Sequence, residues 1–429
     1  MERVYVCDIK DVSESTVLVK GWVHKIHELS TVSFVHLRDK TGIVQLVMDK
    51  EHSKKLRLEM CIEAIGEKVV NEKAPGGLEL DIKEITIIGD VFYEKLPFEI
   101  NGFKQKVALE KQLDYRGLSL RRPKARAVFR IQEEITDAFK TFLRSERFSE
   151  IHTPKLISSS TEGGSEMFTV DYFGRRAFLA QSPQFYKQMM VGAGFERVFE
   201  IAPAYRAELH GTWRHLSEYI SLDVEMGFIK DETDIMDLEE DFLNYLYSAL
   251  RKNCEKELAM YNIELPETIK IPRIPLAEAH NILLEKYNKK SPIGNIDAAG
   301  EVLISQYVKE TYNCDFVFLT EYPVTKRPMY AMPDNEKPSL TRSFDLIFKG
   351  LEITTGGQRI HNYEMLKENI VKFGLDPEDF TFYLETFKYG MPPHGGFAIG
   401  LERLTLKILD LENIREATLL PRDLKRLEP

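Results

Sequence analysis

Short runs of alternating apolar and polar residues fill about the first 100 positions of the chain. VLVKGWVHKI, SFVHLRDKTGIVQLVM and LELDIKEITII are rich in β-branched residues, and glycine or aspartate lies between them. A period of two is typical of strands with one buried face. The sequence Asp39-Lys-Thr-Gly42 has the composition of a hairpin turn. The pattern therefore predicts an all-β domain over residues 1–102.

Several short strands are arranged most economically as a small five-stranded barrel, because closure leaves no unpaired edge. The pattern favours an OB-fold, and an SH3-like barrel is the alternative that the strands alone leave open. Residues 103–124 have little apolar periodicity, and Pro123 lies near their end. We predict that this segment is a hinge between two domains.

From Ala125 the apolar period changes to that of a helix. Mixed apolar and charged strands follow, separated by helical segments such as 232–257 and 363–373. The strands come in runs and do not alternate regularly with helices. This order predicts an α+β domain over residues 125–429, with an antiparallel sheet flanked by helices. The apolar face of the first helix consists of Val128, Phe129, Ile131, Ile135, Phe139 and Phe142.

The composition agrees with two domains, since 429 residues are too many for one hydrophobic core. We find no run of about 18 apolar residues and no apolar leader, so we expect neither a membrane span nor a secretory signal. The four cysteines lie far apart, which argues against a zinc site or a disulfide framework and favours the cytoplasm. The net charge of -10 argues against a general nucleic-acid binder without excluding a local basic face.

Three strand-like segments carry charged residues at positions expected to be buried, where a charge is costly unless it has a partner or binds a ligand. They are Tyr205-Arg206-Ala-Glu208, residues 350–359 and residues 395–403. Arginine suits a polyanionic ligand because its planar guanidinium binds phosphate or carboxylate in a bidentate way. An ion pair between Arg206 and Glu208, or tight packing at the glycines, would also explain these segments. Neither a Walker A pattern nor GxGxxG is present.

In order and spacing, these features resemble the signature motifs of class II aminoacyl-tRNA synthetases. The helix ending in FSEIHTP resembles motif 1, residues 205–228 resemble motif 2, and residues 395–403 resemble motif 3. The resemblance covers essentially the whole chain. It implies a homodimer around motif 1, with ATP and Mg²⁺ at the active site and tRNA as the acceptor.

Shorter segments are similar to the aspartyl and asparaginyl members of that family. They are TEGG at 161–164, QSPQFYK at 181–187, PPHGG at 392–396 and PRD at 421–423. The barrel places the chain in the subgroup that also contains the lysyl enzymes. The lack of a large insert between motifs 2 and 3, and of a long N-terminal extension, resembles archaeal-type aspartyl enzymes. The resemblance implies an aspartate–tRNA ligase that forms aspartyl-adenylate and transfers L-aspartate to tRNA-Asp.

The resemblance also implies roles for single residues at the ATP site. Arg206, Glu208 and Arg403 would form the catalytic set and bind the α-phosphate, adenine and the γ-phosphate, respectively. Phe228 would stack on adenine, although core packing explains a phenylalanine equally well. The ATP site so implied is Arg206, Glu208, Arg214, His215, Leu216, Phe228, Glu352, Gly400, Leu401, Glu402 and Arg403.

By the same resemblance, Glu352 and Thr355 would hold Mg²⁺, a cation that prefers oxygen ligands. Lys187 and Arg359 would bind the side-chain carboxylate of aspartate. Asp223 marks an aspartyl enzyme, since asparaginyl members usually carry Glu there; an ordinary structural carboxylate is the alternative. The aspartate site so implied is Glu162, Ser182, Gln184, Lys187, Arg206, Asp223, Thr355 and Arg359.

In the barrel, Phe34 and Gln45 match the family's anticodon-reading residues. Phe34 would stack on the middle base and Gln45 would hydrogen-bond to it, although strand alternation equally allows Phe34 to lie in the core. Glu79 would contact a flanking base. Archaeal members that reject tRNA-Asn tend to have Trp where this chain has His24, and a basic residue where it has Pro75. We therefore hypothesise that tRNA-Asn is charged as well.

Three other functions compete with this one. Asparaginyl-tRNA synthetase is the nearest, and pyrophosphate exchange with aspartate or with asparagine separates the two. A tRNA-independent paralogue that forms asparagine is the second, but its known forms lack the barrel. A non-catalytic relic is the third; it would have lost the arginine of motif 2 or motif 3, and this chain has both Arg206 and Arg403.

Overall fold

The computed structural model describes residues 1–101, 106–158, 167–209 and 211–428. Their contacts divide the chain into two compact units, Met1–Arg122 and Pro123–Pro429. Helices α2 (Leu109–Asp114) and α3 (Arg116–Ser119) lie within the segment 103–124. The assignment of that segment as a hinge, and the domain limits at 102 and 125, stay predictions.

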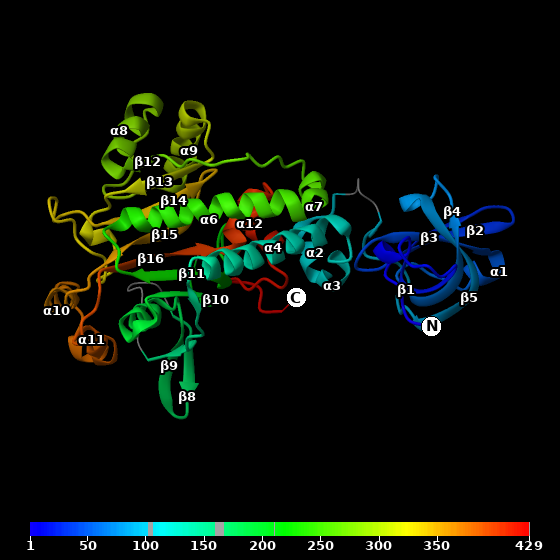
Figure 1. The fold of residues 1–429 in the computed structure, drawn as a ribbon, viewed down its shortest axis with the longest axis horizontal. Coiled ribbons are helices and arrows are strands. Elements are labelled where there is room, and N and C mark those ends of the chain that lie inside the picture. The colour runs from blue at the N-terminus through cyan, green and yellow to red at the C-terminus, as the bar shows by residue number, and fades with distance from the viewer. Residues whose placement is uncertain (102–105, 159–166, 210, 429) are drawn as a thin grey trace. The chain divides into compact units, whose positions relative to one another are not determined.

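The first unit contains a closed five-stranded barrel, as predicted, with the strand order β1-β2-β3-β5-β4 (Figure 1). Val35, Leu37 and Leu46 point inward and are fully buried in its core. The predicted turn is present, since the Asp39 carboxylate accepts the backbone N–H of Gly42 at 3.0 Å. The elements are η1 (Val6–Asp8), β1 (Thr16–Glu28), β2 (Val32–Arg38), β3 (Ile43–Asp49), α1 (Lys50–Ser53), β4 (Cys61–Val70), η2 (Pro75–Gly77) and β5 (Leu78–Gly89).

The second unit is built on an eight-stranded sheet with the order β12-β13-β14-β15-β16-β11-β10-β6. A three-stranded sheet, β7-β9-β8, lies beside it. The central strands are antiparallel, as predicted, but the edge pairs β12–β13 and β10–β6 are parallel. The strands are β6 (Ser149–Glu150), β7 (Leu156–Ile157), β8 (Thr169–Tyr172), β9 (Arg175–Leu179), β10 (Arg197–Tyr205), β11 (Glu218–Gly227), β12 (Arg273–Pro275), β13 (Phe316–Thr320), β14 (Ser343–Phe348), β15 (Leu351–Arg359) and β16 (His394–Gly400).

Two long helices, α4 and α6, run together across one face of this sheet (Figure 1). The ring of Phe139 on α4 packs edge-on against Phe199 of β10 at 5.9 Å and Phe242 of α6 at 5.1 Å. The helices are α4 (Pro123–Ser145), α5 (Gln184–Met190), η3 (Val191–Phe195), α6 (Glu232–Asn253), α7 (Glu255–Met260), α8 (Leu276–Tyr287), α9 (Ala298–Tyr312), η4 (Val324–Lys326), α10 (Tyr363–Lys372), η5 (Pro377–Phe380), α11 (Thr381–Phe387), α12 (Leu401–Ile408) and η6 (Ile414–Ala417).

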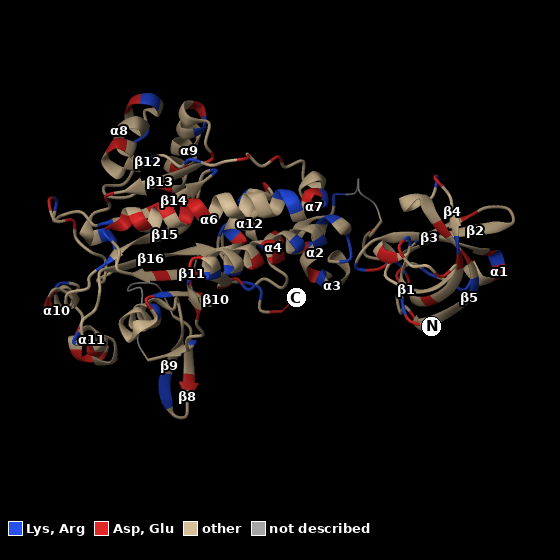
Figure 2. Cartoon of the chain, in the orientation of Figure 1, with Lys and Arg blue, Asp and Glu red and all other residues tan. Residues whose placement is uncertain are grey.

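The predicted helix over 232–257 is in fact two helices. It is interrupted at Cys254, whose φ of -131° and ψ of 27° are not helical, and α7 starts at the next residue. Acidic residues gather in the first half of α6 (Figure 2), where they complement the positive end of the helix dipole. No described helix is long and apolar enough to cross a membrane.

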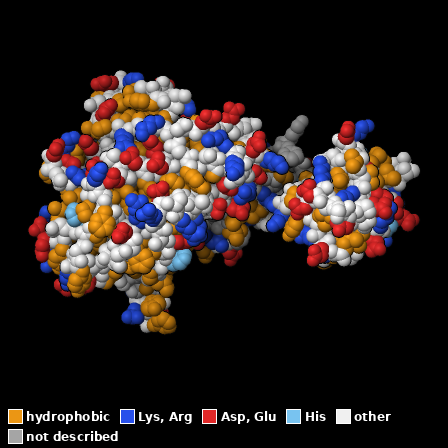
Figure 3. Space-filling view, viewed as in Figure 1, with side chains coloured by type: hydrophobic (Ala, Val, Ile, Leu, Met, Phe, Trp, Pro, Cys, Tyr) orange, Lys and Arg blue, Asp and Glu red, His pale blue; other side chains and the backbone are white. Residues whose placement is uncertain are grey.

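On the face drawn in Figure 3, acidic and basic side chains are interspersed over both units. This face shows no broad basic surface, which agrees with the net charge of -10. A nucleic-acid partner that binds this face would therefore have to be recognised by local groups of residues.

Replacing Glu239 with glutamine is expected to change the pH dependence of stability. Glu239 of α6 is fully buried and accepts the Thr354 hydroxyl at 2.6 Å, while burial raises its pKa to about 8. A carboxyl whose pKa is higher in the folded state costs stability as pH rises through the range between the unfolded and folded pKa values. The variant should be about 2–4 kcal/mol more stable than the wild type at pH 9, and similar to it at pH 5, in urea unfolding. Equal pH slopes for the two proteins would contradict this, and exposed Glu255→Gln is the control.

Candidate active site

The centre of the large sheet places four residues in one row across neighbouring strands. Asp223 of β11 pairs with Ala398 of β16, Ala398 pairs with Thr355 of β15, and Thr355 pairs with Asp345 of β14. Directly paired residues project from the same face of a sheet. The two carboxylates and the hydroxyl therefore face the same side, and the small Ala398 between them leaves a hollow.

This hollow is the floor of a cleft of about 1070 Å³, solvent at its mouth included. Its walls bring together residues from segments that are far apart in the chain, including residues 350–359 and the segments predicted as motifs 2 and 3. Among the described residues, the cations on these walls outnumber the carboxylates, which suits a polyanionic ligand. The cations are Lys187, Arg206, Arg214, Arg327, Arg359 and Arg403, and the carboxylates are Glu208, Asp223, Glu352 and Glu402.

At one end of the cleft, two cations and two carboxylates are buried together. Lys187 donates to Asp223 at 3.0 Å, and both side chains are only 2% exposed. Lys187 also lies 3.4 Å from Glu225, whose other oxygen accepts from Arg359 at 3.2 Å. Burial alone would raise the pKa of Glu225, but Arg359 and Lys187 lower it. Gln184 completes the group by accepting from Arg359 at 3.4 Å.

Gly396 of β16 makes room for this group. A Cβ atom there would lie 2.0 Å from the carbonyl oxygen of Val224 and 2.4 Å from the Glu225 carboxylate. The Gly396 carbonyl also accepts from the Arg359 guanidinium at 3.0 Å. Any side chain at this position would displace Glu225 and with it Arg359, so at least this glycine of residues 395–400 serves close packing.

In the middle of the cleft, the Thr355 hydroxyl lies between two carboxylates. It is 2.9 Å from Asp345 Oδ1 and 3.3 Å from Glu352 Oε1. Burial of the carboxyl group and the nearby Asp345 raise the pKa of Glu352. Arg327 lies 2.9 Å from Asp345, and Arg403 donates to the Glu352 carbonyl at 2.9 Å. Hard oxygen atoms thus gather around one hydroxyl, with an arginine next to each carboxylate residue.

A third group lies where β10 ends and β11 begins. The Arg206 guanidinium is 5.5 Å from the centre of the Tyr219 ring. Glu208 lies 4.0 Å from Arg206 and 3.6 Å from His215. At 4.0 Å the Arg206–Glu208 pair is at the limit of an ion pair, so that pair alone does not account for the two residues. All four side chains line the cleft.

Two predicted ATP-site residues differ from the rest, because Phe228 lies outside the cleft and Glu402 lines it but is hydrogen-bonded to the backbone. Phe228 is 70% exposed, has a φ of 60° and does not line the cleft, because the chain turns out of the sheet after β11. Its predicted stacking on adenine therefore finds no support, and the aromatic ring beside Arg206 is that of Tyr219. Glu402 is buried, and both of its oxygens lie 3.1 Å from the Ile220 nitrogen, which donates to them. Burial raises its pKa to about 8.

The remaining predicted residues of the catalytic unit are divided between cleft and core. Leu401 is buried in the core. Glu162 lies outside the described residues. Arg214 donates to the Glu301 carboxylate at 2.9 Å. Arg214 nevertheless lines the cleft, as do the predicted residues Ser182, His215, Leu216 and Gly400.

Two residues that line the cleft, and one that is hydrogen-bonded to a lining residue, were not predicted from the sequence. Asp345 stands inside the apolar run RSFDLIF, so the reasoning that selected Glu352 inside a strand applies to it as well. Tyr219 lies four residues before Asp223 on β11, and a period of two places both on one face. Arg327 follows η4 outside any periodic segment, and no sequence pattern marks it.

Comparison with known families decides the classification. Residues 108–424 match the family described as tRNA synthetases class II (D, K and N). The chain belongs to this family. Residues 17–88 of the synthetase match the family described as OB-fold nucleic acid binding domain. The barrel is therefore the predicted OB-fold, and the SH3-like alternative is excluded.

Curated relatives are similar to the synthetase over its full length. An "Aspartate--tRNA(Asp/Asn) ligase" of Deinococcus radiodurans is 46% identical, with 100% of this chain and 99% of the relative covered. The protein of that name in Thermus thermophilus is 46% identical, with both chains covered completely. An "Aspartate--tRNA(Asp) ligase" of Pyrococcus horikoshii is 43% identical, with 98% of each chain covered.

Solved structures share the architecture of the synthetase. The asparaginyl-tRNA synthetase from Pyrococcus horikoshii complexed with asparaginyl-adenylate has a TM-score of 0.93 at 31% identity, with both chains covered completely. A putative aspartyl-tRNA synthetase from Leishmania major has a TM-score of 0.90 at 29% identity, with 100% of this chain and 95% of the other covered. The fold is thus common to aspartyl and asparaginyl enzymes.

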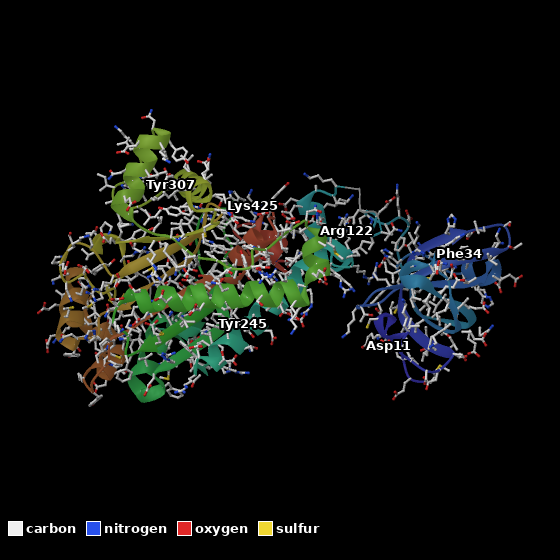
Figure 4. The ribbon with its side chains drawn as sticks, turned by 45° about the horizontal axis from the view of Figure 1, so that its top comes forward. Asp11, Phe34, Arg122, Tyr245, Tyr307 and Lys425 are labelled. Carbon is white, nitrogen blue, oxygen red and sulfur yellow. The ribbon has the colours of Figure 1, made fainter. Side chains whose placement is uncertain are left out.

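The barrel of the synthetase carries three of the predicted anticodon residues, Phe34, Gln45 and Glu79, on its outer face. Phe34 of β2, labelled in Figure 4, is half-buried and does not belong to the barrel core. Gln45 of β3 donates to the Glu79 carboxylate at 2.8 Å, so these two residues form one group. His36, two residues after Phe34 on the same strand, lies 3.3 Å from Gln45. Sequence reasoning missed His36, although a period of two places it beside Phe34.

His24 does not lie on that outer face. It is 5% exposed, and its Nδ1 accepts from Arg38 at 2.7 Å. Arg38 also forms a bidentate pair with the buried Glu59 at 3.2 and 2.7 Å. Burial, together with the charge of Arg38, lowers the pKa of His24 to about 4. Any influence of His24 on the choice of tRNA must therefore act through this buried group. Pro75, the other position of the tRNA-Asn hypothesis, is half-buried at the start of η2.

Proposed function

We propose that this synthetase activates L-aspartate with ATP and transfers it to tRNA-Asp and tRNA-Asn. The assignment of aspartate as the amino acid rests on the buried pair of cations, Lys187 and Arg359, at the closed end of the cleft. A cationic pocket favours a side-chain carboxylate over an uncharged amide. Full-length relatives that are 46% identical carry the name aspartate–tRNA ligase, which supports this choice.

Aspartate would enter the end of the cleft that Lys187, Arg359 and Asp223 form. Its side-chain carboxylate would lie against the two cations, while its α-carboxylate would point toward Arg206. Ser182 and Gln184 would bind the α-amino group, together with Glu162. This orientation places the attacking α-carboxylate beside the arginine that holds the α-phosphate of ATP, so the step depends mainly on positioning.

ATP would occupy the middle and mouth of the cleft. Arg206 would stabilise the charge that builds on the α-phosphate as the adenylate forms and pyrophosphate leaves. Glu208 and Tyr219 would contact adenine, while Arg214, His215 and Arg403 would contact the terminal phosphates. Arg327 adds one more cation to the same wall.

The predicted magnesium residues fit a hard cation. Glu352, Asp345 and the Thr355 hydroxyl supply oxygen donors only, which is the chemistry that Mg²⁺ prefers. Burial and then the neighbouring Asp345 raise the pKa of Glu352, and a bound cation would favour its ionised form. Among the described residues, no group of three or more His, Cys, Asp or Glu could hold a metal ion, so further ligands would come from ATP phosphates and water. When bound, Mg²⁺ would neutralise phosphate charge.

The homodimer and the cytoplasmic location are also part of the proposal. The dimer is inferred from the similarity of the α4–Pro154 segment to motif 1, and analytical ultracentrifugation tests it. A monomer at micromolar concentration would contradict it.

Two assays test the proposed function. Pyrophosphate exchange with aspartate, compared with asparagine, tests the amino acid; exchange with asparagine alone would establish the asparaginyl alternative. Charging of purified tRNA-Asp and tRNA-Asn tests the acceptor. Absence of aspartyl-tRNA-Asn would leave an enzyme specific for tRNA-Asp, like the Pyrococcus horikoshii relative by its name.

Replacing Tyr219 with alanine is expected to raise the KM for ATP about tenfold, with a smaller change in kcat. The reason is that the Tyr219 ring lines the cleft beside Arg206 and would lose its contact with adenine. Phe228→Ala is the matched control, since Phe228 is 70% exposed and outside the cleft. If Phe228→Ala raised the KM for ATP and Tyr219→Ala did not, the original assignment of Phe228 would be restored. Steady-state exchange kinetics measure both.

A further inference from the structure

A chain of hydrogen bonds runs across three strands on the outer face of the barrel. Asn71 and Gln45 both donate to Glu79, at 2.9 and 2.8 Å, and Gln45 Oε1 lies 3.3 Å from His36 Nε2. His36 and Gln45 are direct partners between β2 and β3, and Gln45 and Glu79 are direct partners between β3 and β5. These side chains therefore stand in one row on one face.

The donors and acceptors in this row of hydrogen bonds have a fixed order. An ionised Glu79 only accepts hydrogen bonds, so Gln45 must turn its NH₂ group toward Glu79 and its oxygen toward His36. His36 must then present an N–H to that oxygen. Burial lowers the pKa of His36, so the neutral ring prevails at pH 7 and its single proton belongs on Nε2. With the amide turned the other way, an oxygen would face the Glu79 carboxylate.

We propose that His36 is a positioning residue that locks the amide of Gln45 and thereby selects uracil over cytosine at the middle anticodon base. The inference rests on the proposed function, because it concerns how the proposed tRNA is read. Codons for aspartate and asparagine have adenine in second place, so uracil is the middle base of both anticodons. One lock would thus serve both acceptors.

The lock selects between pyrimidines because their edges are opposite. Uracil presents the O4 acceptor beside the N3–H donor, whereas cytosine presents the N4 donor beside the N3 acceptor. A glutamine amide that is free to turn can pair with either edge, since its oxygen and its NH₂ group exchange places. Gln45 keeps one N–H and one lone pair after its bonds to Glu79 and His36. Held in one orientation, it matches uracil and opposes cytosine.

Phe34 supplies the complementary, non-selective part of the site. It is half-buried on the same strand, two residues before His36, where a base stacked on its ring would meet the Gln45 amide. Stacking tolerates every base because each has a π face. Affinity and selectivity are thereby assigned to different side chains, and substitutions can separate them.

The test uses the full-length enzyme and two tRNA-Asp transcripts that differ only in uracil or cytosine at the middle anticodon base. His36→Leu removes the N–H with little change in size, and His36→Gln restores a donor. Charging rates are normalised to active sites titrated by adenylate formation, so misfolded protein does not count. For His36→Leu we expect the uracil-to-cytosine ratio of kcat/KM to fall about tenfold through KM. His36→Gln should regain most of the ratio, whereas Phe34→Ala should weaken both transcripts by similar factors.

Three results would overturn the inference. They are a wild-type enzyme without preference for uracil, an unchanged ratio in His36→Leu, and an equal loss on both transcripts in His36→Leu. The last result would mean that His36 contributes general affinity. Filter binding of the two transcripts without amino acid gives the same ratios independently of aspartate. If the enzyme shows no aspartate-dependent pyrophosphate exchange while His36→Leu still lowers the uracil-to-cytosine binding ratio, only the assignment of aspartate as the amino acid is wrong.

Discussion

Replacing Arg206 with alanine is expected to lower the rate of aspartate-dependent pyrophosphate exchange by about 10²–10³-fold. Arg206 lines the cleft next to Tyr219 and Glu208. The same cleft is lined by Lys187, Arg359 and Thr355. In the proposed reaction it faces both the attacking carboxylate and the α-phosphate. Charge grows on that phosphate in the transition state, so losing this donor should lower kcat more than it raises either KM.

The matched control for Arg206 is Arg175→Ala. Arg175 begins β9, is exposed and does not line the cleft, so the same change in charge there should leave exchange near the wild-type rate. Thermal unfolding of both variants checks that the fold persists, because Arg206 lies at the end of β10 and outside the core. An Arg206→Ala enzyme that kept more than about a tenth of the wild-type kcat would remove Arg206 from the proposed mechanism.

The fold was predictable where hydrophobic periodicity is strong. The alternation in VLVKGWVHKI and SFVHLRDKTGIVQLVM predicted barrel strands, and β1, β2 and β3 lie there. The helical period from Ala125 predicted α4, which begins two residues earlier because proline is well suited to the first turn of a helix. The break at Cys254 could not be seen from the sequence, since apolar spacing continues across it and neither glycine nor proline marks the position.

Charge inside apolar strands was the most informative signal that the residues themselves gave for the site. It selected Arg206 and Glu352, whereas Asp223 came from the family resemblance, and all three line the cleft. The same signal was present at Asp345 and was overlooked. What sequence spacing cannot supply is the pairing between strands, which brings Asp345 next to Thr355 and buries Glu225 between Lys187 and Arg359.

The positions of Phe228 and His24 in the structure differ from those expected, and both differences have one physical cause. The two residues were selected by their neighbours along the chain, but side-chain direction decides what a residue touches. Phe228 lies just beyond the last residue of β11, where the backbone turns away from the cleft. His24 lies beside a register shift between β1 and β2, and its ring turns inward to Arg38.

Replacing Lys187 with methionine is expected to abolish aspartate activation and also to destabilise the fold by about 3–5 kcal/mol. Lys187 and Asp223 are each 2% exposed and 3.0 Å apart, and Glu225 lies 3.4 Å from the same ammonium group. Without Lys187, two buried carboxylates share the single cation Arg359. Uncompensated carboxylates take up protons, so the deficit in unfolding free energy should grow as the pH rises from 5 to 8.

The double variant Lys187→Met with Asp223→Asn separates stability from function. Removing both charges of the pair should recover at least about 2 kcal/mol of the loss, because Glu225 keeps Arg359 as its partner. Activation of aspartate should stay absent, since one of the two cations for its side chain is still missing. Urea unfolding at pH 5 and 8 measures the first quantity, and pyrophosphate exchange measures the second. A double variant that regains exchange together with stability would show that Lys187 only balances Asp223, and recognition of the substrate carboxylate would then fall to Arg359 alone.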